Sequence, residues 1–175
     1  MNMINPYEVA GKYDLPLSDI SSDLIQQFHR HWLRLCTDGR LPARDAIDPA
    51  NFKRLMPNII LVEIERNPLR VRYRLCGTRV TEFCGNLTGR YLDQIDGDMW
   101  STAAWMQQYK TVVSEGRPIF GQDWLMGKSG ARHLYQTGIW PLATDGNMVD
   151  RCIAVEDYST IRRADLHSAM VAHLL

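Results

Sequence analysis

The stretch that decides the fold is IILVEIERNPLRVRYRLCG, residues 59–77. It contains two runs rich in β-branched and aromatic residues, 59–66 and 70–77, which predict two strands. In the second run apolar residues alternate with three arginines, a period of two that is typical of a strand with one buried face. Asn67 and Pro68 separate the runs with turn-forming residues, so the sequence predicts a β-hairpin.

Helical patterns follow the hairpin over residues 78–116, and three more strand-like runs come after them, at 117–126, 132–142 and 148–159. Short polar turns join these last runs, which predicts an antiparallel meander. An isolated hairpin is barely stable in water, so the hairpin and the meander are expected to share one sheet. The predicted fold class is therefore α+β, with a five-stranded antiparallel sheet and helices on one face.

The two ends of the chain are predicted to flank this core. Residues 1–17 are polar and read as a flexible lead-in, and residues 18–40 contain an amphipathic helix that begins after Ser21 or Ser22. The core is expected over 41–158, and 159–175 read as an amphipathic C-terminal helix.

The composition narrows the class of protein. The chain has 175 residues, of which 45% are hydrophobic and 23% charged, as in ordinary folded domains. Its net charge is zero, so no overall field attracts nucleic acid or anionic membranes. No apolar run is long enough to span a membrane, and the four cysteines form no disulfide pattern. We therefore expect reduced thiols and a bacterial-type cytoplasmic location.

A resemblance to a known family sharpens these expectations. The segment YRLCGTRVTEF followed by GNLTGRYL resembles the PAS domain segment in which a glycine ends the second strand and a short helix follows. The stretch from residue 31 to residue 65 is similar to the entry of a bacterial stand-alone PAS subfamily. The residues that carry the resemblance are Trp32, Pro42, Arg44, Asp48, Pro49, Leu55, Pro57, Tyr73, Gly77, Thr78, Gly89, Pro141 and Leu142.

The resemblance implies a signalling module with no catalytic motif. PAS domains bind small ligands or cofactors between the sheet and the helices, or they bind each other. On this basis we expect a sensory domain that binds a small ligand or a protein partner. Aromatic side chains could line an apolar pocket, and the residues predicted as its walls are Tyr73, Phe83, Trp105, Tyr109 and Trp140.

Two alternative functions remain open at this stage. Arg70, Arg72 and Arg74 lie on one face of a predicted strand and could bind the phosphates of a nucleotide second messenger. They could equally pair with Glu63 and Glu65 across the hairpin. A small lyase or isomerase is the other alternative, although the chain contains no common catalytic motif.

The cysteines, histidines and terminal helices bear on cofactors and partners. Flavin photochemistry would need a reactive cysteine such as Cys84, but the residues around it do not match that pattern. The histidines at 29, 31 and 133 have no spacing typical of haem or zinc ligands, so no cofactor or metal is predicted. The terminal helices predict a homodimer, with an interface formed by Leu24, Phe28, Trp32, Leu166 and Met170.

Overall fold

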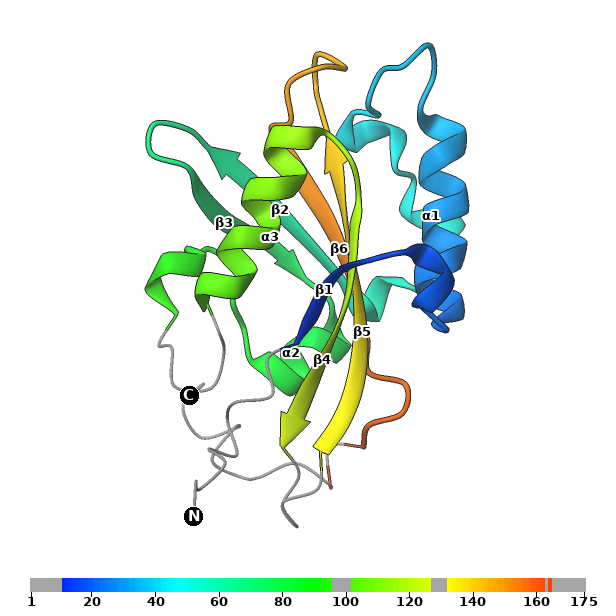
Figure 1. Cartoon of the computed structure of the whole chain (residues 1–175), viewed down its shortest axis with the longest axis vertical. Coiled ribbons are helices and arrows are strands. Elements are labelled where there is room, and N and C mark those ends of the chain that lie inside the picture. Colours follow the sequence, from blue (N-terminus) through cyan, green and yellow to red (C-terminus); the bar gives the residue numbers. More distant parts are fainter. Residues whose placement is uncertain (1–10, 96–101, 127–131, 163, 165–175) are drawn as a thin grey trace.

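The computed structural model describes residues 11–95, 102–126, 132–162 and 164. An antiparallel sheet of six strands forms its centre, in the order β1-β4-β5-β6-β2-β3 (Figure 1). The strands are β1 (Lys12–Leu15), β2 (Ile59–Glu65), β3 (Arg70–Cys76), β4 (Ile119–Met126), β5 (Arg132–Leu142) and β6 (Arg151–Asp157). The helices are α1 (Asp23–Leu35), α2 (Thr78–Cys84) and α3 (Thr102–Glu115), with short 3₁₀ helices η1 (Leu17–Asp19), η2 (Arg44–Ala46), η3 (Pro49–Phe52), η4 (Met56–Asn58) and η5 (Leu92–Gln94).

The predicted fold class is confirmed, with one more strand than expected. Strands β4, β5 and β6 form the antiparallel meander, and the β2–β3 hairpin joins it through pairing of β2 with β6. The additional strand is β1, which pairs with β4 inside the segment predicted to be a lead-in. Residues 12–15 carry no strong strand signal of their own, so it is the pairing with β4 that orders them.

Helices α2 and α3 cover one face of the sheet, and α3 lies in front of the sheet in Figure 1. Their apolar side chains pack onto alternate residues of the strands, because successive side chains of a strand point to opposite faces. The core between them is formed mainly by Ile60, Val62, Val71, Tyr73, Val80, Phe83, Trp105, Tyr109, Val112, Tyr135, Ile139, Cys152, Ala154 and Tyr158.

The opposite face of the sheet is also covered, which the prediction of helices on one face did not include. Helix α1 and the segment from Ile47 to Leu55 pack on the strand residues that point away from α3. This second core contains Ile20, Ile25, Phe28, Trp32, Ile47, Phe52, Leu55, Ile59, Phe120, Trp140, Leu142, Ile153 and Val155.

Polar contacts fix the beginning of α1 on the sheet. Ser22 is the N-cap residue, and its hydroxyl accepts a hydrogen bond from the Ile25 amide at 3.3 Å. The same hydroxyl donates to the Asp157 carboxylate at 2.5 Å, and the Ser22 amide donates to Gln136 at 2.8 Å. Gln136 belongs to β5 and Asp157 to β6, so hydrogen bonds hold the start of the helix directly on the sheet.

The glycine that ends β3 is required by a close approach. A side chain at Gly77 would place its Cβ 2.3 Å from the Met56 carbonyl oxygen and 2.4 Å from that of Pro57. Glycine has no Cβ and avoids this clash, so the chain can enter α2 immediately after the strand. Gly89 has a φ of +88°, the left-handed conformation that glycine adopts without steric cost.

The C-terminal helix predicted over 159–175 lies outside the described residues, apart from the first few positions. In the described part of the chain, no helix combines the length and the apolar character needed to cross a membrane.

The anchor of α1 gives the first testable prediction. Ser22→Ala removes both the helix cap and the partner of a buried carboxylate, so the free energy of unfolding should fall by about 1–3 kcal/mol. Urea denaturation would measure the change. Ser18→Ala is the matched control, because Ser18 bonds only its exposed neighbour Asp19, and it should change stability by less than about 0.5 kcal/mol. Equal effects of the two substitutions would contradict the anchoring role.

Candidate ligand-binding site

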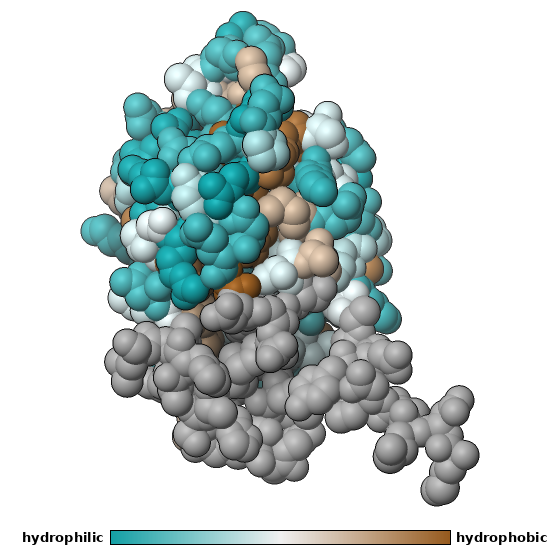
Figure 2. Space-filling view, turned by 90° about the vertical axis from the view of Figure 1, so that its left-hand side faces the viewer, coloured by the Kyte–Doolittle hydropathy of each residue, from teal (hydrophilic) through white to brown (hydrophobic). Residues whose placement is uncertain are grey.

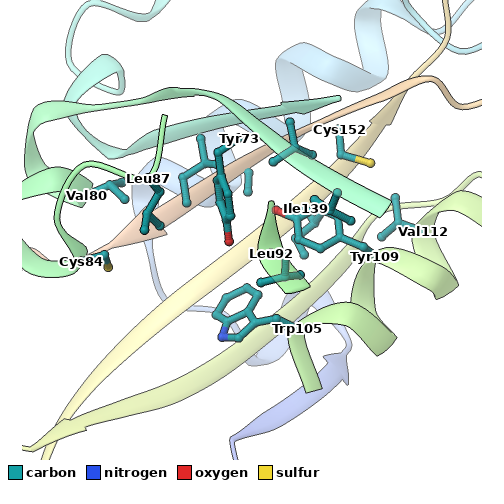
Figure 3. Packing of buried hydrophobic residues seen from close by; sticks show 14 of the residues in the cluster. Tyr73, Val80, Cys84, Leu87, Leu92, Trp105, Tyr109, Val112, Ile139 and Cys152 are labelled. Atoms are coloured by element: carbon teal, nitrogen blue, oxygen red, sulfur yellow. The ribbon is translucent and has the colours of Figure 1, made fainter. Parts of the chain in front are cut away.

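The candidate site lies between the sheet and helices α2 and α3. Four of the five predicted pocket residues meet there, namely Tyr73 from β3, Phe83 from α2, and Trp105 and Tyr109 from α3. Figure 3 shows Tyr73 and Tyr109 on either side of Leu92, with the indole of Trp105 below them. These residues therefore come from three separate elements and share one buried layer.

The fifth predicted pocket residue, Trp140, belongs to the opposite face. It is fully buried in the second core, where its ring packs edge-on against Phe28 at 4.7 Å between centroids. Its indole Nε1 donates a hydrogen bond to His29 Nδ1 at 3.1 Å. The neighbouring Ile139 faces the candidate site instead, so the prediction was wrong by one position in the alternation of β5.

A buried carboxyl group lies at the centre of the site's polar chemistry. Glu156 on β6 is 5% exposed and accepts a hydrogen bond from the Tyr158 hydroxyl. Because that hydroxyl proton is used, the Cys84 thiol is left to donate to the Tyr158 oxygen, 3.3 Å away. Tyr158 stacks on Phe83, with ring centroids 4.6 Å apart. A thiol, a phenol and a carboxyl group thus form a short hydrogen-bonded chain inside the core.

Burial sets the electrostatics of this group. Loss of water contact raises the pKa of Glu156 to about 7, against a smaller lowering effect of the Tyr158 hydrogen bond. The pKa values of Tyr73 and Tyr135 are raised well above 10, first by burial and second by the charge of Glu156. Burial followed by the charge of Glu156 also raises the pKa of Cys76, to about 11.

Three polar side chains in this layer have buried atoms without a hydrogen-bond partner among the described residues. They are Gln108 through Nε2, Tyr135 through its hydroxyl and Thr137 through Oγ1. Gln108 is 4% exposed, Tyr135 1% and Thr137 0%. Tyr135 and Thr137 alternate on β5, and α3 packs against β5 with Gln108 on its buried side. Buried polar groups are normally paired, so these three atoms favour a bound partner.

The unpredicted strand β1 adds a polar pair at the edge of the layer. The Tyr13 hydroxyl donates to the Asp123 carboxylate at 2.6 Å. The Tyr13 ring lies 6.4 Å from that of Trp105, measured between centroids. Burial raises the pKa of Asp123, while the hydrogen bond from Tyr13 acts in the opposite direction. Strand β1 therefore lies along one side of the candidate site.

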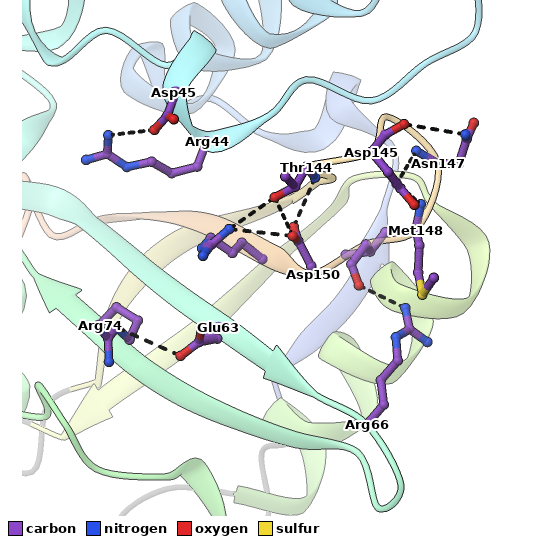
Figure 4. Close-up of polar contacts among 12 residues, drawn as sticks. Arg44, Asp45, Glu63, Arg66, Arg74, Thr144, Asp145, Asn147, Met148 and Asp150 are labelled. Carbon is purple, nitrogen blue, oxygen red and sulfur yellow. Dashed lines mark hydrogen bonds and ion pairs between the residues drawn. The ribbon is translucent and has the colours of Figure 1, made fainter.

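The three arginines of β3 are largely engaged with other side chains. Arg70 makes a bidentate ion pair with Asp93, at 2.8 and 2.9 Å, and its guanidinium lies over the ring of Tyr91. Arg74 lies 3.9 Å from Glu63 across the hairpin, as Figure 4 shows. Arg72 Nε is buried without a hydrogen-bond partner. The interpretation as pairing across the hairpin describes Arg74 with Glu63, whereas the carboxylate that pairs with Arg70 is Asp93 in η5.

The predicted dimer interface coincides with the chain's own core. Phe28 is fully buried and Trp32 is 5% exposed, and both pack on the sheet. Leu24 is partly buried against the same cluster. An interface through these side chains would require α1 to leave the sheet. Leu166 and Met170 lie outside the described residues.

The candidate cofactor residues are accounted for by packing. Cys84 is buried beside Tyr158, and His29 accepts the bond from Trp140. All four cysteines are free in the structure. Within the described ranges, no three His, Cys, Asp or Glu side chains are grouped in a way that could hold a metal ion.

A small apolar hollow lies on the other side of the sheet. It is formed by residues such as Phe52, Leu61, Leu75 and Ile153 and has a volume of about 40 Å³, which is too small for an organic ligand. Figure 2 views the molecule from the side on which β3 forms the sheet edge and shows a strip of hydrophobic surface between hydrophilic areas.

Comparison with known proteins agrees with this architecture. The family described as PAS domain matches residues 20–112. Three solved structures are similar to the chain at low sequence identity. A light-oxygen-voltage domain studied with a flavin analogue is 14% identical, with a TM-score of 0.44 and coverage of 71% of this chain and 90% of that one. An RNA-binding light-oxygen-voltage receptor is 17% identical, with a TM-score of 0.44 and coverage of 79% and 40%.

The third is the PAS domain of an HTR-like protein from Haloarcula marismortui. It is 16% identical, with a TM-score of 0.36 and coverage of 62% of this chain and 88% of that one. No curated protein matches the chain.

Glu156 was not predicted as a site residue, and it gives a test of the site's electrostatics. Its pKa in the folded chain, about 7, lies above the ordinary value of 4.5, so the folded state holds the proton more tightly than the unfolded state. The free energy of unfolding should therefore fall as the pH rises between these two pKa values, by about 3 kcal/mol from this group alone.

Glu156→Gln should remove that part of the pH dependence, so the variant gains stability relative to the wild type between pH 5 and about 8. Urea denaturation at several pH values would measure the difference. Glu63→Gln, on the exposed side of the hairpin, is the matched control and should follow the wild-type profile. Parallel profiles for the wild type and Glu156→Gln would show that the carboxyl group is not perturbed.

Proposed function

The chain belongs to the PAS domain family, and from that premise we propose that it is a non-enzymatic sensory module that binds a small ligand between the sheet and helices α2 and α3. The observation that carries the proposal is the set of unpartnered buried atoms of Gln108, Tyr135 and Thr137. Leaving such a group unsatisfied costs about 1–3 kcal/mol, so three of them in one layer favour a ligand that bonds them.

The surroundings indicate what such a ligand must offer. The Gln108 amide nitrogen only donates hydrogen bonds, so the ligand needs at least one acceptor, such as a carbonyl or ether oxygen. The Tyr135 and Thr137 hydroxyls can donate or accept. Trp105 and Tyr109 supply flat apolar surface next to these groups. A small, largely apolar or aromatic compound with one or two polar atoms fits this set.

A route for the signal follows from the same strand. Glu156 faces the candidate site, and its neighbour Asp157 holds the start of α1 through Ser22. A ligand shifts a conformational equilibrium only through its different affinities for the two states. We therefore place the output in the position of α1 on the sheet, read by a protein partner in a bacterial cytoplasm. A homodimer through Phe28 and Trp32 is not part of this proposal, because those side chains fill the core.

One observation favours a second candidate function. Glu156 has the strongly perturbed pKa that a small lyase or isomerase would need for a general acid or base. Its hydrogen bond with Tyr158 and its burial suit a structural or sensing role equally well. The two functions differ in outcome, because a sensor releases its ligand unchanged and an enzyme converts it.

The experiment that tests the proposal begins with the purified wild-type chain. Its absorption spectrum and native mass should show a bound compound, which mass spectrometry of the denatured protein then identifies. Tyr135→Phe combined with Thr137→Val should lose that compound. Without a ligand, these near-isosteric changes remove only unpartnered polar atoms and should leave stability unchanged or higher.

Tyr91→Phe is the control, since it removes a hydroxyl that bonds Glu65 outside this layer. It should retain the compound. A wild-type chain that carries no compound, together with a site variant that is more stable than the wild type, would overturn the proposal. Conversion of the added compound that is lost in Glu156→Gln would replace the sensor with the enzyme.

A further inference from the structure

A second concave region lies on the opposite side of the sheet, between α1 and the segment that follows Asp48. Its volume is about 630 Å³, within the range of pockets that bind small molecules. The walls that matter for its chemistry are Arg30, His31 and Arg34 from α1, and Asn51, Lys53 and Arg54 from the facing segment.

The charge of this pocket is of one sign. Arg30, Arg34, Lys53 and Arg54 contribute four positive charges, and no Asp or Glu lines the pocket. None of the four makes an ion pair with another described residue within 4 Å. Like charges four residues apart on a helix, as Arg30 and Arg34 are, destabilise it slightly. The arrangement therefore has a cost within the free chain that a bound anion would offset.

The contrast with the other arginines makes this concentration specific. Arg70, Arg79 and Arg117 each have a carboxylate within 3 Å. The chain as a whole is neutral, because it has as many acidic as basic residues. Arg40, Arg66 and Arg90 make no ion pair either, but each donates a hydrogen bond to a backbone carbonyl. The pocket thus gathers four cations without an acidic partner in one concave place.

A histidine in the same wall has an environment that reports on the charge of the pocket. His31 Nε2 is inaccessible to water and has no hydrogen-bond partner among the described residues. The imidazole is held edge-on against Phe52, with ring centroids 4.3 Å apart, so its orientation is fixed by packing. Burial and then the charge of Arg34 lower the pKa of His31. The charge of a bound anion would act on this imidazole across the pocket wall.

We infer that this pocket binds a small molecule rich in phosphate groups, such as a nucleoside triphosphate or a linear polyphosphate. Arginine guanidinium groups match phosphate oxygens in a bidentate geometry, and lysine adds a point charge. The pocket's concave shape and limited volume suit a small molecule, and the neutral chain has no general attraction for nucleic acid. This site is separate from the ligand site between the sheet and α3, and the test of one site does not depend on the other.

The test is isothermal titration of the full chain with inorganic tripolyphosphate and with ATP, without magnesium. Each is expected to bind once per chain, and affinity should fall as salt is raised, because the contacts are charged and partly exposed. Arg30→Gln/Arg34→Gln removes one wall and Lys53→Gln/Arg54→Gln the other. All four side chains are exposed, so both variants should fold, and each should bind about tenfold more weakly or worse.

The matched control is Arg70→Gln/Arg74→Gln, which removes the same charge from the strand that is the other candidate for phosphate binding. It should bind as the wild type does. An NMR pH titration of His31 gives a second readout, since a bound polyanion favours the imidazolium and should raise the pKa of His31. Absence of binding at millimolar concentration, pocket variants that bind as tightly as the wild type, loss of binding in the control, or tight binding only to an oligonucleotide would each overturn the inference.

Discussion

Burial of both faces of strand β6 is the constraint on which the rest of the structure depends. The strand lies between β5 and β2, and its residues alternate between the two cores. Cys152 and Ala154 face α3, while Ile153 and Val155 face α1. The alternation continues through the polar pair, since Glu156 bonds Tyr158 in one layer and Asp157 bonds Ser22 in the other. Strand β6 therefore has no free face, and each layer has its own polar anchor at the same end of this strand.

The parts of the fold that could be predicted are those with a strong local pattern. The β2–β3 hairpin and helix α1 formed as expected because their apolar residues repeat at two and at three to four positions. Strand β1 was missed for a physical reason. It has four residues, and Asp14 has a φ of +56°, which shifts the register against β4 and breaks the alternation. Its order comes from contacts more than 100 residues away in the chain, such as that of Tyr13 with Asp123.

The candidate site was predictable in its aromatic residues and not in its polar ones. Tyr73 and Phe83 lie in recognisable elements, so their direction could be inferred. Trp140 was placed in the wrong layer because the facing of a strand that is buried on both sides cannot be derived from hydrophobicity. Glu156 had a weak signal, a carboxylate that ends the apolar run CIAV, but its environment depends on α2 and Tyr158. A pKa is a property of the assembled core.

The distribution of positive charge over the surface also could not be predicted from the sequence. Composition gives a neutral chain, and only the fold separates paired arginines such as Arg70 from unpaired ones such as Arg30. The ligand that we propose for the layer facing α3 is small and mostly apolar, and the one that we propose for the surface of α1 is anionic. Asp157 accepts the hydrogen bond from Ser22 that holds the start of α1. Because Glu156 is its neighbour in the chain, a ligand that reorients Glu156 would displace the backbone next to Asp157. Closely packed cores transmit such displacements, and this is the basis of the signal route that we propose from the candidate site to α1.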